Sequence, residues 1–517
     1  MTPGNTTSHP ADRGRTHWFR RWLRWPWSRS VSGRTPNGSG PGAATPFDLD
    51  TPLLNWSRTD RFSARDLVAG GVLLLGRSGS GKTSSSGRTL GSGILRLPGS
   101  GGLILAATST DRDMWIRMLA KAGREQDLLV FGPNEPLRFN VLDYARRLND
   151  DPRNIVHCLQ TLAESLRGQE NRSTGDQEQF WQLQNERALY AAVVVVRLAR
   201  GGKVSAPDLQ TFITEAATSP EQISDPKWVA GTHSQWLDAA HRASKSEIEQ
   251  HDFDLAVEYW LGSYPSMAEK TRSCIVAGVM GLLHVFNTGV VRQLVSETTT
   301  VTPDDTLAGR WVLVDMSPNE WGISGNLVCA GWKYLTQRAV LKRRNVEGAS
   351  VHTLWIDEAH LHMSSFDATY LAQCRSRRGC MVLLTQSLPG LYAALPKALG
   401  EHQANSLLSN FGHTIVHAVD PVSAEWAARK LGRQRETFFG GSAQPDTDAF
   451  DELFGTPRIT GSYSEHYEPV LQDGVFMNGL RTGGPRNGYA CDAIVIRSGE
   501  SFSTGTNWLW HTFRQEF

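Results

Sequence analysis

Eight consecutive residues of the sequence fit a phosphate-binding loop of the form GxxxxGK[ST]: Gly76, Arg77, Ser78, Gly79, Ser80, Gly81, Lys82 and Thr83. Glycines allow a backbone to fold tightly around phosphates and to point its N–H groups at them, and the start of a following helix adds a positive dipole end. Lys82 would reach the β- and γ-phosphates of a nucleotide, and Thr83 would bind Mg²⁺. The alternative is a loop that is merely glycine-rich, in a chain with 49 glycines. The apolar run before the motif and the helical pattern after it favour the phosphate site.

Two adjacent carboxylates, Asp357 and Glu358, follow the apolar run Leu354–Ile356. In nucleotide hydrolysis the first would hold Mg²⁺, and the second would polarise the attacking water. With the next two residues they spell DEAH, a helicase box, but no later segment resembles the second motor domain of a helicase. An exposed strand end is the alternative interpretation.

The next apolar run, Met381–Thr385, ends in Gln386, whose side-chain amide would sense the γ-phosphate. Arg375 and Arg377 lie just before that run. Phosphoryl transfer builds negative charge on phosphate oxygens, and an arginine from a neighbouring subunit can neutralise it. A basic helix end that is only solvated is the alternative. The predicted catalytic residues are therefore Lys82, Glu358, Gln386, Arg375 and Arg377, with Thr83 and Asp357 as metal ligands.

These residues need a sheet to position them, and seven short apolar runs are predicted to be its buried strands: Val72–Leu75, Leu103–Ala106, Leu128–Phe131, Trp311–Asp315, Thr353–Asp357, Met381–Thr385 and Thr414–His417. Helical stretches alternate with most of these runs. Such alternation is typical of an α/β fold in which helices cover a mainly parallel sheet.

Residues 150–300 interrupt this alternation, because no convincing strand pattern is found there. We predict an all-α insertion between two parts of the α/β domain, residues 51–149 and 301–440. The predicted helices are Phe180–Arg200 with a cap at Ser173 or Thr174, Pro207–Ala217 with a cap at Ser205, Ser244–Leu261, and Ser266–Phe286 with a capping box at Ser266 and Glu269. Residues 441–517 are predicted to be a β-rich extension, to which no function is assigned.

The composition is that of an ordinary globular protein, and 517 residues with 40% hydrophobic side chains predict several domains. A net charge of +1 gives no overall basic field, so any nucleic-acid contact must come from local patches. No uncharged apolar stretch approaches the roughly 20 residues of a membrane-spanning helix. The six cysteines show no CxxC spacing and indicate reduced core thiols in a cytosolic protein.

Residues 1–50 are rich in Gly, Pro, Ser and Thr and are predicted to be a disordered arm. Within this arm, residues 17–29 read HWFRRWLRWPWSR, so tryptophans are interleaved with arginines. The segment would suit docking on an anionic membrane surface, stacking on nucleic acid, or a role as a solvated basic arm. Composition leaves all three interpretations open.

The order of the motifs resembles that of the type IV coupling proteins of the TraG/TraD kind, which are ATPases of conjugative DNA transfer in the FtsK–HerA superfamily of P-loop DNA pumps. Besides the loop and the acidic pair, the matching segments are Arg138–Asp143 (RFNVLD), Phe180-Trp181, Gln386-Ser387, Ser409–Gly412 (SNFG) and Asp420–Glu425 (DPVSAE). They fall within roughly residues 66–435. Two features differ from the family pattern: Ala106–Thr110 stands in place of an Asp-x-Lys motif, and the family's N-terminal membrane helices are not seen.

The resemblance implies a RecA-like P-loop NTPase domain interrupted by an all-α insertion, with ATP and Mg²⁺ as nucleotide and metal. It implies a DNA translocase that works as a homo-hexameric ring on single- or double-stranded DNA, with a relaxase and secretion-channel proteins as partners. The expected location is the cytoplasm, with peripheral contact at the inner face of the membrane through residues 17–29. Two alternatives remain, a related translocase in chromosome handling or defence and a nucleotide-binding scaffold that does not pump. Candidate DNA contacts are Lys342, Arg343, Arg344 and Arg378.

Overall fold

The computed structural model describes residues 47–166, 176–395, 400–444 and 458–516. All of them belong to one compact unit, Pro46–Phe517. The basic segment 17–29 lies outside the described residues. The backbones of Phe47 and Leu49 hydrogen-bond to the folded unit at 3.3 and 2.7 Å. Residues 47–50, which were predicted to belong to the arm, are therefore part of the folded unit.

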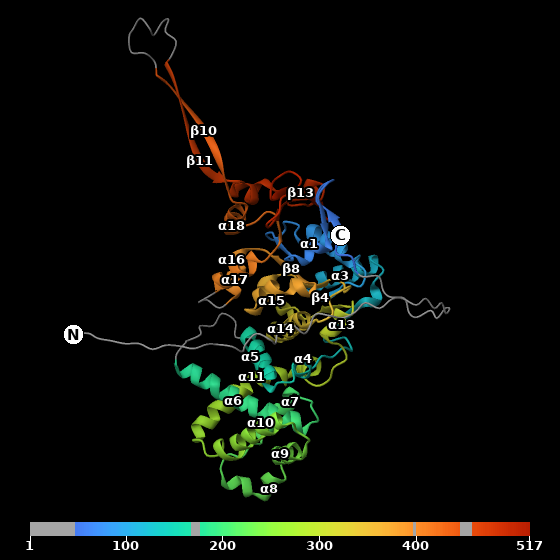
Figure 1. The fold of residues 1–517 in the computed structure, drawn as a ribbon, viewed down its shortest axis with the longest axis vertical. Coiled ribbons are helices and arrows are strands. Elements are labelled where there is room, and N and C mark those ends of the chain that lie inside the picture. The colour runs from blue at the N-terminus through green and yellow to red at the C-terminus, as the bar shows by residue number, and fades with distance from the viewer. Residues whose placement is uncertain (1–46, 167–175, 396–399, 445–457, 517) are drawn as a thin grey trace, which may run out of the picture. The chain divides into compact units, whose positions relative to one another are not determined.

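A nine-stranded sheet forms the core of this unit, with the strand order β13-β12-β9-β3-β8-β7-β4-β6-β5 (Figure 1). The strands are β3 (Val72–Leu75), β4 (Gly101–Leu105), β5 (Leu128–Phe131), β6 (Trp311–Val314), β7 (His352–Ile356), β8 (Gly379–Thr385), β9 (His413–Val416), β12 (Ala490–Arg497) and β13 (Trp508–Arg514). The seven strands from β3 to β9 are parallel to one another. They are the seven strands expected from the sequence, so the predicted α/β class with a mainly parallel sheet is confirmed.

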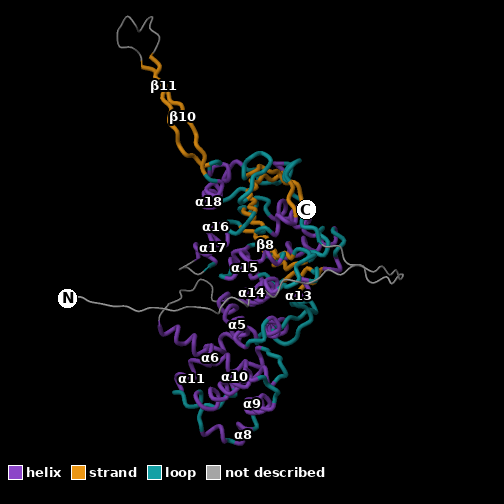
Figure 2. Tube along the Cα trace, in the orientation of Figure 1, coloured by secondary structure: helices purple, strands orange, loops and turns teal. Residues whose placement is uncertain are grey.

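Helices cover both faces of the sheet (Figure 2). Successive strand residues point to opposite faces, so Leu74 of β3 packs in one apolar cluster and Leu73 in another. The first cluster includes residues of α1 (Ala64–Val68), α2 (Arg88–Leu95) and α3 (Ser109–Lys121). The second includes residues of α4 (Val141–Leu148), α14 (Pro318–Lys342), α15 (Phe366–Cys374), α16 (Leu388–Ala394), α17 (Gly400–Ser409) and α18 (Pro421–Leu431). This double cover explains why the parallel strands read as continuous apolar runs.

Between β5 and β6 the described residues form helices and no strand. After α4 these helices are α5 (Pro152–Leu166), α6 (Asp176–Ala199), α7 (Ala206–Thr214), α8 (Pro226–Val229), α9 (Thr232–Arg242), α10 (Glu247–Val257), α11 (Glu269–Phe286), α12 (Gly289–Val295) and α13 (Pro303–Leu307). Ser205 caps α7 as predicted, because its hydroxyl accepts a hydrogen bond from Asp208 N. The caps predicted at Ser173 or Thr174 lie outside the described residues.

The capping box predicted at Ser266 is wrong. Helix α11 begins at Glu269, and its N-cap is Ala268, whose methyl side chain cannot accept a hydrogen bond. The Ser266 hydroxyl instead donates to Gly262 O at 2.9 Å, in the π-helical turn that precedes α11. The Ser266 hydroxyl therefore forms a hydrogen bond with the preceding turn instead of capping α11.

The last two strands are part of the central sheet rather than of a separate extension. Strand β12 pairs antiparallel with β9, and β13 pairs antiparallel with β12. The sequence did not indicate this, because antiparallel edge strands need no helical crossover, and β13 is only partly buried and gives no continuous apolar run. Two smaller antiparallel pairs stand outside this sheet, β1 (Pro52–Asn55) with β2 (Arg61–Ser63) and β10 (Arg433–Gln444) with β11 (Arg458–Pro469).

All six cysteines are unpaired, and five of them are buried. Cys274 is exposed, so the prediction of a core thiol is wrong at that position. In the part of the chain that the structure describes, no single helix has both the length and the apolar character to cross a membrane. Helices α11 and α12 satisfy that criterion only when taken together, and they are bent by 78°.

Acid should weaken the fold through the buried His233. Its Nδ1–H donates to Phe212 O at 2.7 Å, its ring stacks on Phe212, and burial lowers its pKa from 6.5 to about 4. Between pH 6.5 and 4 the unfolded chain takes up a proton at this residue that the folded chain does not, so His233 alone should lower the free energy of unfolding by about 1.4 kcal/mol per pH unit.

Urea unfolding at pH 7.5, 6.5 and 5, followed by far-ultraviolet circular dichroism, checks this expectation. The variant His233→Gln should show a shallower loss of stability between pH 6.5 and 5 than the unmodified protein. Equal slopes in the two proteins would contradict the assigned role of His233.

Candidate active site

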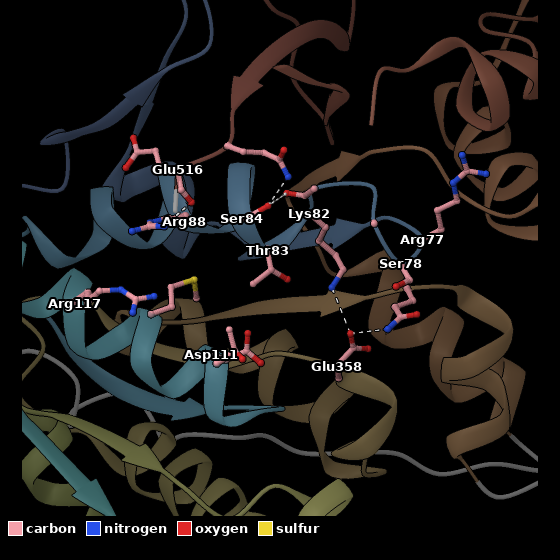
Figure 3. A pocket seen from close by; sticks show the side chains of 16 residues that line it. Arg77, Ser78, Lys82, Thr83, Ser84, Arg88, Asp111, Arg117, Glu358 and Glu516 are labelled. Atoms are coloured by element: carbon pink, nitrogen blue, oxygen red, sulfur yellow. Dashed lines mark hydrogen bonds and ion pairs between the residues drawn. The ribbon is translucent and has the colours of Figure 1, made fainter. Parts of the chain in front are cut away.

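The sheet brings the predicted motifs to one edge. Strands β3, β8 and β7 are neighbours and run parallel, so their carboxyl ends lie together. The loop Gly76–Thr83 follows β3, the pair Asp357 and Glu358 follows β7, and Gln386 follows β8. Side chains from all three segments line one cavity of about 410 Å³ (Figure 3). This edge is where open α/β sheets bind their ligands.

The loop requires glycine at two positions of positive φ. Gly79 and Gly81 have φ values of +76° and +87°, which other residues rarely adopt. A Cβ atom on Gly81 would also come within 2.3 Å of Cys491 Sγ. Directly after the loop, Thr83–Gly87 form a π-helical turn that leads into α2. The start of this helical segment therefore lies at the cavity, where its N–H groups favour an anion.

Lys82 lies between the two carboxylates. Its Nζ atom is 3.6 Å from Asp357 Oδ1 and 3.8 Å from Glu358 Oε1. The side chains of Lys82 and Asp357 are only 6% and 4% exposed. Burial raises the pKa of Asp357 to about 6, although the Lys82 ammonium acts in the opposite direction. The arrangement is a buried, partly compensated charge cluster, which is typical of functional sites.

The donor atoms present fit a magnesium ion. Mg²⁺ prefers hard oxygen ligands and usually takes one or two of them from protein, with the rest from phosphates and water. The hydroxyl of Thr83 and the carboxylate of Asp357 supply two such oxygens. Among the described residues, no group of three or more His, Cys, Asp or Glu side chains is arranged to hold a metal. An ion at Thr83 and Asp357 would therefore need further oxygens from phosphates and water.

Glu358 combines a strained backbone with one unengaged oxygen. Its φ of 48° and ψ of 62° lie in the left-handed region, where strain of about 1–3 kcal/mol in non-glycine residues concentrates at functional sites. Gln386 Nε2 donates to Glu358 Oε1 at 2.8 Å. The other oxygen, Oε2, is buried without a hydrogen bond from any described residue and lies 3.5 Å from His360 Nδ1. One oxygen is thus fixed, while the other accepts no hydrogen bond from a described residue. A general base needs an acceptor atom of this kind.

The cavity is also lined by residues that no sequence motif indicated: Ser84, Arg88, Thr110, Asp111, Met114, Arg117, Gln515 and Glu516. Asp111 could have been recognised from a local sequence pattern, the helix cap that it forms with Thr108. Thr108 accepts from Asp111 N at 3.3 Å and donates to its carboxylate at 2.7 Å, and this Thr-x-x-Asp cap starts α3 in the segment that replaces the family's Asp-x-Lys motif. Burial raises the pKa of Asp111. Gln515 had no local signal, because its partner Ser84 is 431 residues away along the chain.

Arg375 and Arg377 lie away from this cavity. They form a short 3-10 turn directly before β8, so they stand at the amino end of the strand whose carboxyl end carries Gln386. Both line a separate cavity of about 420 Å³, and Arg377 Nη1 donates to Arg343 O at 3.0 Å. A catalytic role for these arginines would require the site of another subunit, and it stays a prediction.

The strand order, the glycine loop and the acidic pair define the class of fold, a RecA-like P-loop NTPase domain with inserted helices. One particular protein with this fold is the bacterial conjugative coupling protein TrwB. The unbound monoclinic form of TrwBdeltaN70 has a TM-score of 0.54 and 16% identity, covering 91% of this chain and 89% of that chain. The trigonal form in complex with sulphate has a TM-score of 0.53 and 16% identity, covering 93% and 97%. TrwB in complex with ADP and Mg²⁺ has a TM-score of 0.51 and 16% identity, covering 89% and 88%.

No family model and no curated protein matches the chain. At 16% identity the likeness to TrwB establishes the fold. The resemblance inferred from the order of the sequence motifs is therefore confirmed at the level of fold, and so is the RecA-like architecture.

Proposed function

We propose that this protein is an ATP-hydrolysing DNA translocase, a coupling protein of conjugative (type IV secretion) DNA transfer. The observation that carries the proposal is the contact between three predicted catalytic groups: Lys82 lies 3.8 Å from Glu358, and Gln386 hydrogen-bonds to Glu358 at 2.8 Å. A loop that only bound nucleotide would need the lysine alone. A base beside that lysine, hydrogen-bonded to a sensor, is what hydrolysis requires.

The proposed chemistry uses the chain's own groups. The backbone N–H groups of Gly76–Thr83 hold the phosphates, and Lys82 neutralises charge on the β- and γ-phosphates. Glu358 accepts a proton from the attacking water through Oε2, while Gln386 holds Oε1 and reaches the terminal phosphate. Mg²⁺ at Thr83 and Asp357 would supply further charge neutralisation on the phosphates.

The wider proposal is supported by the fold. TrwB, a conjugative coupling protein, shares it over 91% of this chain, and one solved TrwB complex contains ADP and Mg²⁺. On this basis we extend to this chain a homo-hexameric ring, DNA as the transported partner, and a relaxase and secretion-channel proteins as further partners. Sites completed between subunits, through Arg375 and Arg377, belong to the same proposal.

Contact with DNA must be local, because the net charge is only +1. Two of the four candidate contacts are engaged within the chain. Arg343 donates to Ser350 O at 3.0 Å, and Arg378 donates to Ala349 O. Lys342 and Arg344 are the candidates that remain for phosphate contact.

The test is phosphate release by the purified protein with ATP. We expect hydrolysis to require Mg²⁺, to rise when DNA of any sequence is added, and to lose that stimulation as salt is raised. Binding of ATP without hydrolysis would instead favour a nucleotide-binding scaffold, and hydrolysis indifferent to DNA would refute a translocase. A relaxase gene beside the gene of this protein would separate conjugation from chromosome handling or defence.

Peripheral membrane contact through residues 17–29 is a separate part of the proposal. Deletion of residues 1–46 should leave ATP hydrolysis nearly unchanged, because the phosphate-binding loop, the acidic pair and Gln386 all follow this segment in the sequence, but it should reduce flotation with anionic vesicles. The matched control is the full chain with Trp18, Trp22, Trp25 and Trp27 replaced by Ser, which keeps the arginines and should also float less. Equal flotation of all three proteins would leave only a solvated arm.

A further inference from the structure

The cavity extends beyond the groups that phosphates need. Its lining includes Lys82, Glu358 and Gln386, here called the catalytic end, and also Arg88, Met114, Arg117, Gln515 and Glu516, here called the second end. Figure 3 shows Lys82 and Glu358 on one side of Thr83, and Arg88 and Arg117 on the other side. Because the loop lysine reaches the β- and γ-phosphates, a bound nucleotide would direct its nucleoside to the second end.

Gln515 is fixed at this second end by both atoms of its side-chain amide. Its Oε1 accepts from Gly484 N at 2.7 Å, and its Nε2 donates to Ser84 Oγ at 2.8 Å. A backbone N–H can only donate, so the amide cannot be turned over without losing the bond to Gly484. Each amide atom keeps one bonding site, a lone pair on Oε1 and an N–H on Nε2. Gln515 therefore presents one acceptor and one donor in a fixed order.

Met114 and Arg117 lie on successive turns of α3 and offer surfaces suited to a flat ring. Met114 is apolar and only 8% exposed. Arg117 is exposed, and no hydrogen bond or ion pair engages its guanidinium among the described residues. Guanidinium groups pack on the faces of aromatic rings, and thioethers make favourable contacts with ring edges. The neighbouring Arg88 differs, because it donates to Glu516 O.

We propose that Met114, Arg117 and Gln515 form the nucleoside-binding end of this site, an inference that rests on the proposed nucleotide hydrolysis. The base packs against Met114 and Arg117, and the Gln515 amide hydrogen-bonds to the nucleoside. The segment after β13 also contacts the π-helical turn that follows the loop, because Glu516 N donates to Ser84 O at 3.2 Å. The last strand of the sheet thus contributes to ligand recognition as well as to the fold.

The experiment compares two ligands, ATP and inorganic triphosphate, each titrated with Mg²⁺ by calorimetry. Inorganic triphosphate has the phosphates without the nucleoside, so its affinity reports on the loop alone. Gln515→Ala and Arg117→Gln should each weaken ATP binding about three- to tenfold, the worth of one hydrogen bond or one cation–ring contact. Both variants should leave triphosphate binding within about twofold of the unmodified protein.

Arg514→Gln is the matched control, since Arg514 is exposed, adjoins Gln515 and does not line the cavity. It should leave both affinities unchanged. An equal loss of ATP and triphosphate affinity in Gln515→Ala and Arg117→Gln, or no loss of ATP affinity, would overturn the nucleoside assignment. Arg117 is on a helix surface, so its variant tests the assignment even if Gln515→Ala disturbs the fold. If the unmodified protein bound neither ATP nor inorganic triphosphate, the proposed function would be refuted instead.

Discussion

Glu358→Gln should bind ATP about as well as the unmodified protein while hydrolysing it on the order of 10²–10⁴-fold more slowly. The amide keeps the volume of the carboxylate and an oxygen that Gln386 Nε2 can still reach, and it leaves Asp357 unchanged. What it removes is the proton acceptor at Oε2, which no described residue engages by a hydrogen bond. The measurement is single-turnover hydrolysis beside equilibrium binding of ATP.

Lys82→Ala should give a different pattern, with loss of both hydrolysis and tight binding. It removes the cation that lies 3.6 Å from Asp357 and leaves that buried carboxylate without its partner. For Glu358→Gln the control is Glu425→Gln, which also replaces a carboxylate by an amide. Glu425 is 57% exposed on α18, pairs with Arg429 and does not line the cavity. Turnover of ATP by Glu358→Gln at the unmodified rate would show that the base has been assigned to the wrong residue.

Mixing two inactive proteins should restore hydrolysis if Arg375 and Arg377 complete the site of a neighbouring subunit. The two proteins are Lys82→Ala and the double variant Arg375→Ala/Arg377→Ala. An arginine supplied by a neighbour is worth roughly 10³–10⁵ in rate, so each parent should be nearly silent. In a head-to-tail ring assembled at random from equal amounts, about one interface in four pairs an intact loop with intact arginines.

The control is a mixture of Lys82→Ala with Glu358→Gln. These residues lie 3.8 Å apart in one cavity of one chain, so no mixed interface contains both intact. This mixture should stay silent even when fluorescently labelled subunits are seen to exchange. If the arginine mixture is as silent as this control under the same exchange, the arginines do not act across an interface.

The central strands could be predicted from the sequence because each of them is marked by its own run of apolar residues. Parallel strands covered on both faces must be apolar throughout, and β3 and β8 accordingly read as unbroken runs that end in Gly76 and Gln386. Glycines at 79 and 81 are required by their backbone conformation, so the loop could be found from residue types alone. Three of the predicted catalytic groups lie together because they follow neighbouring parallel strands.

The remaining residues of the cavity could not be predicted, because their positions depend on contacts between segments that lie far apart in the sequence. Gln515 follows an edge strand whose half-exposed pattern resembles many surface strands, and its role depends on Ser84 and Gly484, which come from distant segments. Asp111 was accessible in principle through its cap at Thr108. The false capping box at Ser266 shows the reverse case, in which a correct local pattern loses to the preceding turn.

The position of β3 in the sheet has a consequence for the order of events during synthesis. This strand carries the phosphate-binding loop near the beginning of the chain, yet Val72 pairs with Val382 and His413, and the Ser84 that follows is bonded by Gln515. A ribosome that has made the loop has made none of the strands that flank it. The nascent chain must therefore keep four apolar residues of β3, all buried in the finished fold, without their neighbours until β8 and β9 have been made, some 300 residues later. Protection of this segment by the helices beside it or by a chaperone would decide how much of the newly made chain reaches a working state.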